Sequence, residues 1–370
     1  MQLSYWEHKS WLTNIEFTIV GSGIVGLSTA IFLKENHPNS KILVLERGIL
    51  PQGASTKNAG FACFGSLSEI IADLNSHTEN EIYELVKQRY EGIKLLRKLL
   101  GDSNIGYEQH GGHEIFPEKN LALFEECLQK KNNINQLLRP IFGKKPFAET
   151  VNIFGFDNIH SKYITHKFEG QVDTGAMMDS LLRKATKLGV KILNSVEVLE
   201  FSDTLTKVHV KTKDFEFSTT KLFLTTNGFA SQFLGDLIKP ARAQVLITKP
   251  IKNLSIKGTF HFDEGYYYFR NIDNRILFGG GRNLDFKTEE TVKFGQTKVV
   301  QNRLAELLQE VILPNTPFEV DLRWSGIMGV GKQKRPILKS ISENIYCGVR
   351  MGGMGIAIGS SVGKTLANLV

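Results

Sequence analysis

The chain has 370 residues, of which 41% are hydrophobic and 22% are charged. This balance excludes an intrinsically disordered chain, and the length predicts about two domains. The three cysteines, Cys63, Cys127 and Cys347, are far apart and odd in number. They argue against a disulfide scaffold or a zinc module and favour a reducing compartment. The net charge is +7, but the basic residues are dispersed, so we interpret them as a solvated surface and expect no nucleic-acid partner.

The amino-terminal residues contain no apolar core of a signal peptide. The longest uncharged stretch runs from Phe17 to Leu33, which is at the lower limit for a membrane span, and glycines interrupt it. A buried strand followed by a buried helix gives the same pattern. We therefore expect no membrane span and a cytoplasmic protein.

A glycine motif follows the first predicted strand, at residues 17–20, and opens a predicted helix that extends to residue 34. The pattern GxGxxG in this context is typical of dinucleotide-binding folds. The first glycine allows a tight turn, the second lets a pyrophosphate approach the backbone, and the third lets the helix pack on the strand. The free N–H groups at the start of the helix then face the phosphates. The motif consists of Gly21, Ser22, Gly23, Ile24, Val25 and Gly26.

A second predicted strand, at residues 41–45, ends at Glu46, about 20 residues beyond Gly26, where a ribose-binding acid is expected. Its carboxylate would repel a 2′-phosphate, so NADP is not expected. The alternative is a glycine-rich turn without a ligand. The motif alone does not separate NAD from FAD. The small, polar segment 53–61 favours FAD, because an NAD enzyme would normally continue with an ordinary helix there.

The stretches SYW, GSGIVGLSTA, LERG and GASTKNAGF resemble the D-amino-acid oxidase family of FAD-dependent oxidoreductases. Glycine oxidase, sarcosine oxidase and γ-glutamylputrescine oxidase belong to this family. The resemblance covers essentially the whole chain. It implies an α/β fold in which a doubly wound, Rossmann-type FAD-binding domain is interleaved with an antiparallel-sheet (α+β) substrate domain. We expect the FAD-binding domain at 15–75, 150–230 and 325–370, and the substrate domain at 76–149 and 231–324.

The resemblance also implies which residues contact FAD. Val196 would contact the adenine through its backbone, and the glycine-rich segment 352–359 would open a helix that points its amino end at the flavin. The residues through which some relatives attach FAD covalently are absent, so we expect FAD to be dissociable. A P-loop at 359–365 fails on its spacing. Besides the glycine motif and Glu46, the expected FAD contacts are Arg47, Ala54, Ser55, Thr56, Asn58, Ala59, Gly60, Phe61, Val196, Thr226, Asn227, Gly228, Arg350, Gly352, Gly353, Met354, Gly355 and Ile356.

Substrate contacts are expected from strands at QVLITKP, GYYYFR and RILFGGGR, which predict an antiparallel sheet. Alternation sends Tyr266, Tyr268 and Arg270 to one face and Tyr267 to the other. The first three are candidate substrate contacts, with plain sheet packing as the alternative.

Two departures from the family pattern bear on the substrate and on the electron acceptor. Met328 stands where the resemblance places glycine oxidase's carboxylate-binding arginine, and we expect Arg350 to bind an anionic substrate group instead. Leu277 fills the position of the lysine at which oxygen reacts in sarcosine oxidase-like members. Oxygen and another electron acceptor therefore both remain open.

We expect an oxidoreductase that oxidises a C–N bond of an amine or amino acid by hydride transfer to flavin N5. One alternative is a flavoprotein that oxidises a 2-hydroxy acid or a sugar phosphate, for which His110 or His113 would be the base. The spacing of these two histidines does not match a zinc motif, and no metal is expected. A tRNA-modifying FAD oxidoreductase, which the basic charge permits, and a non-catalytic flavin-binding module are also compatible with the sequence.

Overall fold

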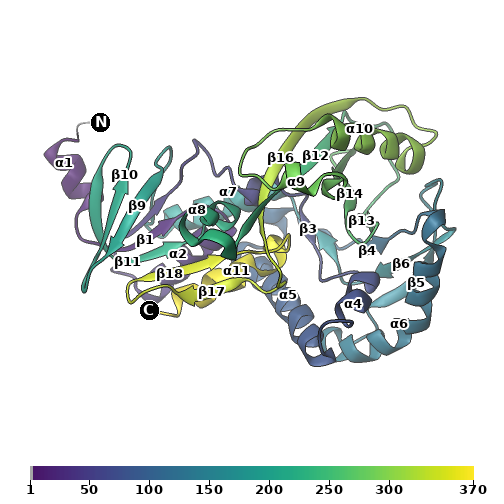
Figure 1. Cartoon of the computed structure of the whole chain (residues 1–370), viewed down its shortest axis with the longest axis horizontal. Helices are drawn as coiled ribbons and strands as arrows, with labels where there is room; N and C mark the ends of the chain where they lie inside the picture. The colour runs from purple at the N-terminus through teal and green to yellow at the C-terminus, as the bar shows by residue number, and fades with distance from the viewer. Residues whose placement is uncertain (1–2) are drawn as a thin grey trace.

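The computed structural model describes residues 3–370, and two large β-sheets lie side by side along its long axis (Figure 1). In the first sheet, strands β8, β2, β1, β11 and β18 are parallel neighbours in that order, and β17 closes the edge in the antiparallel direction. Strands β10 and β9 continue antiparallel from β11. These strands are β1 (Ile15–Val20), β2 (Ile42–Leu45), β8 (Lys191–Leu193), β9 (Val198–Asp203), β10 (Val208–Thr212), β11 (Glu216–Leu224), β17 (Ile337–Ser340) and β18 (Ile345–Val349).

The parallel strands of this sheet are short apolar runs because both of their faces are buried. One face packs against the helices α2 (Ile24–Asn36), α7 (Thr174–Lys187) and α11 (Gly355–Ala367). The other face packs against β9 and β10. Two distant parts of the chain meet in the helical layer, since Gly363 of α11 leaves no room for a Cβ, which would lie 2.6 Å from the Cβ of Ser28 on α2.

The second sheet has the order β16-β12-β15-β14-β13-β4-β6-β5. Its neighbours are antiparallel, as predicted, except for the parallel pair β13 and β4. The strands are β4 (Gly112–Glu114), β5 (Phe147–Val151), β6 (Lys162–His166), β12 (Lys239–Thr248), β13 (Thr259–Phe262), β14 (Tyr267–Ile272), β15 (Arg275–Gly280) and β16 (Val320–Val330). The expected boundary at residue 150 needs correction, because β6 lies in the second sheet and pairs with β4 and β5.

The two faces of the second sheet are covered differently. The outer face packs Tyr267, Phe269 and Phe278 against α10 (Lys298–Leu307). We call the other face the inner face; there Tyr268 and Leu277 pack near Ala59. Tyr267 and Tyr268 thus pack on opposite faces of the sheet, which confirms the predicted alternation of these two residues. The helices α4 (Leu67–Asp73) and α6 (Leu121–Phe142) lie beside the β4–β6 end of the inner face (Figure 1).

The remaining elements are short or connect the two sheets. Strands β3 (Phe61–Ala62) and β7 (Gly170–Gln171) form a two-stranded ribbon between them. The other helices are α1 (Tyr5–Glu7), α3 (Ala54–Lys57), α5 (Glu79–Leu100), α8 (Ser231–Leu234) and α9 (Phe286–Glu289). None of the helices within residues 3–370 has the length and apolar character needed to cross a membrane.

Candidate active site

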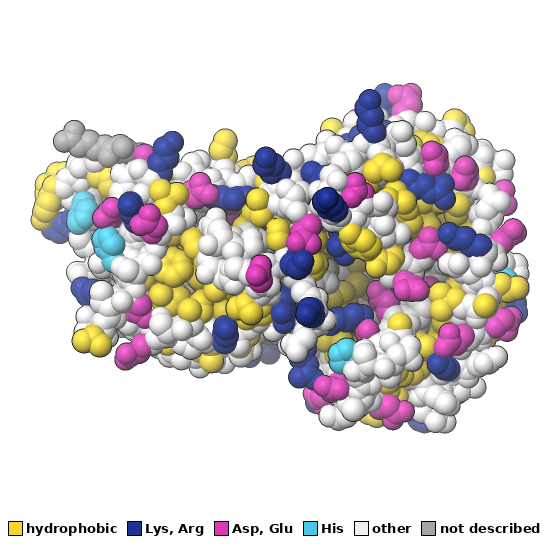
Figure 2. Space-filling model, viewed as in Figure 1, with side chains coloured by type: hydrophobic (Ala, Val, Ile, Leu, Met, Phe, Trp, Pro, Cys, Tyr) yellow, Lys and Arg dark blue, Asp and Glu magenta, His cyan; other side chains and the backbone are white. Residues whose placement is uncertain are grey.

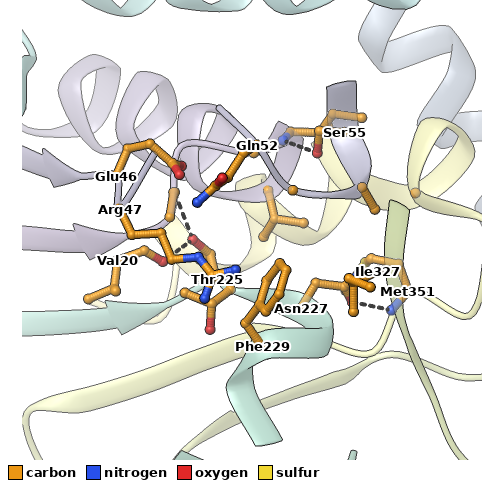
Figure 3. A pocket seen from close by; sticks show the side chains of 18 of the residues that line it. Val20, Glu46, Arg47, Gln52, Ser55, Thr225, Asn227, Phe229, Ile327 and Met351 are labelled. Carbon is orange, nitrogen blue, oxygen red and sulfur yellow. Dashed lines mark hydrogen bonds between the residues drawn. The ribbon is translucent and has the colours of Figure 1, made fainter. Parts of the chain in front are cut away.

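A cavity opens at the carboxyl ends of the parallel strands β1, β2 and β11. This edge is where open α/β sheets bind ligands. The cavity is elongated: Glu46 and Arg47 lie toward one end, and Ile327 and Met351 lie toward the other (Figure 3). Its walls therefore combine the amino-terminal βα unit with strands and loops that lie far away in the sequence.

The glycine motif forms one wall, and its glycines are required by space. A Cβ on Gly26 would lie 1.9 Å from the carbonyl oxygen of Gly21 and 2.7 Å from Oγ1 of Thr225. Gly21 has a φ of +101°, which side-chain-bearing residues rarely adopt. A Cβ on Gly23 would lie 2.8 Å from Oγ of Ser55, which accepts a hydrogen bond from the N–H of Ile24 at 2.9 Å. The start of α2 and the start of α3 thus meet in a bare main-chain cradle.

Glu46 lies at the end of β2 and is held in place by main-chain and side-chain donors. Its Oε2 accepts hydrogen bonds from the N–H of Ser22 at 3.1 Å and from Oγ of Ser22 at 2.7 Å. Its Oε1 accepts one from the N–H of Gly48 at 3.0 Å. Each carboxylate oxygen has further acceptor capacity, so the group can also receive ribose hydroxyls.

The wall beside Glu46 is a stack of flat side chains. The guanidinium of Arg47 lies 3.7 Å from the centre of the Phe229 ring, and both residues line the cavity (Figure 3). Val196 also lines this end, but its N–H is donated to the carbonyl oxygen of Glu46 at 2.9 Å. Only its carbonyl remains for an adenine contact.

The opposite end of the cavity is made by the turn after β11 and the segment before α11. Oδ1 of Asn227 accepts a hydrogen bond from the N–H of Met351 at 3.1 Å (Figure 3). It accepts another from the N–H of Arg350, also at 3.1 Å. Oγ1 of Thr226 is buried and has no hydrogen-bond partner in the described part of the chain, although Thr226 lines the cavity. A buried hydroxyl without a partner is costly and indicates a polar ligand. The cradle, the acid and this hydroxyl together fit a phosphate-containing dinucleotide.

Most of the expected cofactor contacts line this cavity. Those that line it are Gly21, Gly23, Ile24, Val25, Glu46, Arg47, Ala54, Ser55, Asn58, Val196, Thr226, Asn227, Gly353, Gly355 and Ile356. Those that do not are Ser22, Gly26, Thr56, Ala59, Gly60, Phe61, Gly228, Arg350, Gly352 and Met354. Several of the second group support the first, since Ser22 holds Glu46 and Gly26 makes room for Gly21.

Other lining residues were not among the expected contacts. Gln52 and Gly53 adjoin the expected segment, so extending it by two residues would have included them. Ile327 and Met328 come from β16 and carry no local signal of a cofactor. The full set of unexpected lining residues is Val20, Leu45, Gln52, Gly53, Glu197, Val198, Thr225, Phe229, Gln232, Ile327, Met328 and Met351.

Arg350, which was expected to contact FAD and to bind an anionic substrate group, does not line the cavity. Its Nη2 donates to the carbonyl oxygen of Arg335 at 3.0 Å, and its Nη1 lies 3.5 Å from the carbonyl oxygen of Leu237. The side chain is therefore bound to main-chain carbonyls outside the cavity. Its φ of +65° lies in the left-handed region, directly after the end of β18.

Arg270 lies on the inner face as predicted, but it is buried as a main-chain anchor. Its Nη1 donates to the carbonyl oxygens of Val172 at 2.6 Å and of Ala59 and Gly60 at 3.3 Å. Burial lowers the pKa of its guanidinium to about 10. Arg270 thus fixes the segment after α3 against the second sheet.

The inner face presents aromatic side chains toward the segment 57–61. The ring of Tyr268 packs edge-on against Phe61 at 5.8 Å, and burial raises the pKa of its hydroxyl to about 12. The indole N–H of Trp324 donates to the carbonyl oxygen of Lys57 at 2.9 Å. Tyr266 lies just before β14 and is more exposed. Figure 2 shows a hollow in this half of the molecule, between the part with α10 and β16 and the part with α4 and α6.

The two histidines singled out in the sequence do not lie on the inner face. His110 is exposed and contacts Glu108. His113 points to the outer face, where its Nδ1 bonds to Oγ1 of Thr165 and its ring packs on Phe260. Burial lowers the pKa of His113 to about 4.

Comparison with known proteins agrees with this geometry. The family model described as FAD dependent oxidoreductase, DAO, matches residues 16–369. The chain is 22% identical over 393 residues to the probable oxidoreductase OrdL of Haemophilus influenzae, covering 97% of this chain and 84% of that protein. It is 23% identical over 382 residues to the gamma-glutamylputrescine oxidoreductase of Escherichia coli, covering 95% and 82%.

Solved structures share the fold. The glycine oxidase from Geobacillus kaustophilus superposes with a TM-score of 0.76 at 17% identity, covering 96% of this chain and 94% of that one. The predicted fold class is therefore confirmed.

Proposed function

The chain belongs to the DAO family of FAD-dependent oxidoreductases, and we propose that it oxidises a C–N bond of an amine or amino acid. The names of two similar proteins, gamma-glutamylputrescine oxidoreductase and glycine oxidase, support this substrate class. When bound, FAD supplies the oxidising power by accepting, at flavin N5, a hydride from the carbon next to the substrate nitrogen.

We assign the cavity to FAD on the basis of its walls. Glu46 would bind the adenosine ribose, and the cradle at Gly21 and Gly23 would receive the pyrophosphate. The free hydroxyl of Thr226 would donate to the cofactor. No cysteine or histidine is among the lining residues, which supports the prediction of dissociable FAD.

One observation carries the proposal: a single strand, β16, serves both regions. Ile327 and Met328 line the far end of the cavity, whereas Trp324 of the same strand packs in the inner-face cluster with Tyr268. A substrate bound against the inner face would therefore lie beside that end of the cofactor. The chain's own contribution would be to position the substrate and exclude water.

The alternative of alcohol oxidation is less well supported by the structure. That reaction needs a base for the hydroxyl, and the sequence offered only His110 and His113. His110 is exposed and lies outside the strands, and His113 packs on Phe260 on the outer face of the second sheet.

The proposal can be tested by anaerobic addition of amines to the purified FAD-containing protein. The panel is glycine, sarcosine and γ-glutamylputrescine, with lactate as the alcohol control. Loss of the oxidised flavin absorbance with an amine and not with lactate is the expected result. Bleaching by lactate alone would replace the proposal with the alternative, and admitting air afterwards would show whether oxygen is the acceptor.

A further inference from the structure

A row of directly paired residues crosses the second sheet on its inner face. Gly279 on β15 pairs with Tyr268 on β14, Tyr268 pairs with His261 on β13, and His261 pairs with Glu114 on β4. Paired residues point to the same face of a sheet, and their Cβ atoms are about 5 Å apart in antiparallel pairs. Tyr268, His261 and Glu114 therefore form a polar row on the inner face, beside the aromatic cluster near the cofactor cavity.

The tyrosine in this row leans away from the histidine. A Cβ on Gly279 would lie 2.7 Å from the ring of Tyr268, so the ring covers this glycine on the side opposite to β13. The absence of a side chain at Gly279 thus provides the space that the tyrosine occupies. The ring of Tyr268 therefore lies over Gly279 and not over His261.

Glu114 is held from the other side. It is buried, and its two carboxylate oxygens accept hydrogen bonds from Oγ and from the N–H of Ser68 at the start of α4. Burial raises the pKa of this carboxyl group, while the charge of His261 opposes that shift. The charges of the two side chains are therefore coupled across the β4–β13 pair.

His261 itself is unsatisfied. Neither of its ring nitrogens has a hydrogen-bond partner among residues 3–370, and its Nε2 is fully shielded from solvent. The other two histidines on strands of this sheet each have one ring nitrogen in a hydrogen bond and are packed among aromatic rings, although Nε2 of His166 is also buried without a partner in the described part of the chain. His113 bonds to Thr165, and Nδ1 of His166 accepts the N–H of Phe168, while burial lowers the pKa of His166 to about 3. An unpartnered imidazole nitrogen is expensive to bury and calls for a ligand.

We propose that His261 is the catalytic residue that accepts the proton of the substrate ammonium, with Glu114 as its positioning residue. This inference rests on the proposed amine oxidation, and it assigns the substrate to the amines that arrive as cations. An N–H bond of the ammonium breaks, and the proton moves to an imidazole nitrogen. The freed lone pair forms the new C=N bond as the adjacent C–H bond breaks and its hydride, with both electrons, reduces FAD. The imidazolium then returns its proton to water.

Several ionisable groups interact with His261, and their charges act on an imidazolium in opposite directions. The carboxylate of Glu114 favours the imidazolium, whereas His113 and His166 would oppose it if they were charged. These two histidines have lowered pKa values and are neutral near pH 7. Tyr268 is also neutral, because burial raises its pKa to about 12. Glu114 is therefore the group that can tune the base.

The first test is the rate of anaerobic flavin reduction as a function of pH, with the most reactive amine of the panel. We expect His261→Gln to lower this rate about 100-fold near neutral pH and to remove its rise with pH. Glu114→Gln should shift that rise to lower pH, because the imidazolium loses its stabilising charge. His110→Gln, which changes the exposed histidine, is the matched control and should behave as wild type. An unchanged pH profile in His261→Gln would overturn the proposal.

A second test needs no turnover. tert-Butylamine has no α-hydrogen and cannot be oxidised at carbon, so its binding can be followed by the flavin spectrum. In the wild type, its apparent Kd should rise by up to about tenfold per pH unit as the pH is lowered, because an imidazolium must first lose its proton before it can accept one from the ammonium. This dependence should vanish in His261→Gln, or in His261→Asn if the first variant loses FAD.

The two tests separate the inference from the proposed function. If no amine reduces the flavin but tert-butylamine binds with this histidine-linked pH dependence, the oxidation fails and the amine site stands. If an amine reduces the flavin and the dependence is the same in both proteins, the oxidation stands and the role of His261 fails.

Discussion

The cofactor cavity and the inner face of the second sheet differ in whether main chain or side chains form the important surface. One wall of the cavity is formed by main chain that glycines leave bare, and its motif lies within ten residues of one strand end. The inner face is formed by side chains that strand pairing brings together from residues 114, 261, 268 and 324. The first kind of site can be recognised from spacing along the chain, and the second depends on register between strands.

The largest effect on FAD binding is expected when one methyl group is added to the main-chain cradle. Gly26→Ala would place a Cβ 1.9 Å from the carbonyl oxygen of Gly21, and neither backbone segment can yield cheaply. We expect the variant to purify with little FAD and to lose about 1–3 kcal/mol of stability or more. FAD content after denaturation and the unfolding midpoint are the measurements.

The matched control for that change is Gly53→Ala, in the same cavity. No atom lies within 4 Å of the Cβ that it would add, and its φ of −72° suits alanine. It should retain FAD and stability. Equal FAD loss in both variants would mean that any glycine change at the cavity is harmful and that close packing is not the reason.

A second change probes the side-chain region. Arg270→Met would leave the carbonyl oxygens of Ala59, Gly60 and Val172 without their buried donor. We expect a loss of about 2–4 kcal/mol in the free energy of unfolding, together with weaker FAD binding, because the segment after α3 is no longer fixed.

Arg350→Met is the comparison for this change, because that arginine bonds to carbonyls outside the cavity. It should cost less than about 1 kcal/mol and leave the apparent substrate affinity unchanged. A large rise in KM for the amine substrate in Arg350→Met would restore the assignment of Arg350 as a substrate ligand.

The smallest expected effect concerns the free hydroxyl in the cavity. Thr226→Val removes a buried group that has no protein partner, so the stability of the FAD-free protein should be unchanged or slightly higher. The affinity for FAD should fall about 5- to 10-fold, equivalent to about 1 kcal/mol. Titration of the FAD-free protein with denaturant measures its stability, and titration with FAD measures the affinity. An unchanged affinity would show that Thr226 does not contact the cofactor.

The residues differ in how far the sequence could place them. The motif at Gly21–Gly26 and the acid Glu46 were predicted at the cavity because each acts through a fixed local geometry. His261 gave no signal, because its importance depends on its pairing with Glu114 and Tyr268. The contacts of Arg350 could not be predicted, because nothing near it in the sequence indicates a φ of +65° or a hydrogen bond to the carbonyl oxygen of Arg335.

The sequence by itself determined the family, the use of FAD, the parallel sheet with its glycine turn, and the alternation of Tyr266–Arg270. The family follows from the resemblance of several motifs. Local chemistry is sufficient for the others, since a turn, a strand period or a helix start involves neighbours in the chain. Only the tertiary structure decided that β5 and β6 join the second sheet, that Arg270 is an anchor, and that His261 is unsatisfied beside Glu114. These depend on strand pairing and on which buried polar groups find partners, and both are settled by packing between segments that lie far apart in the chain, such as residues 59 and 270 or 114 and 261.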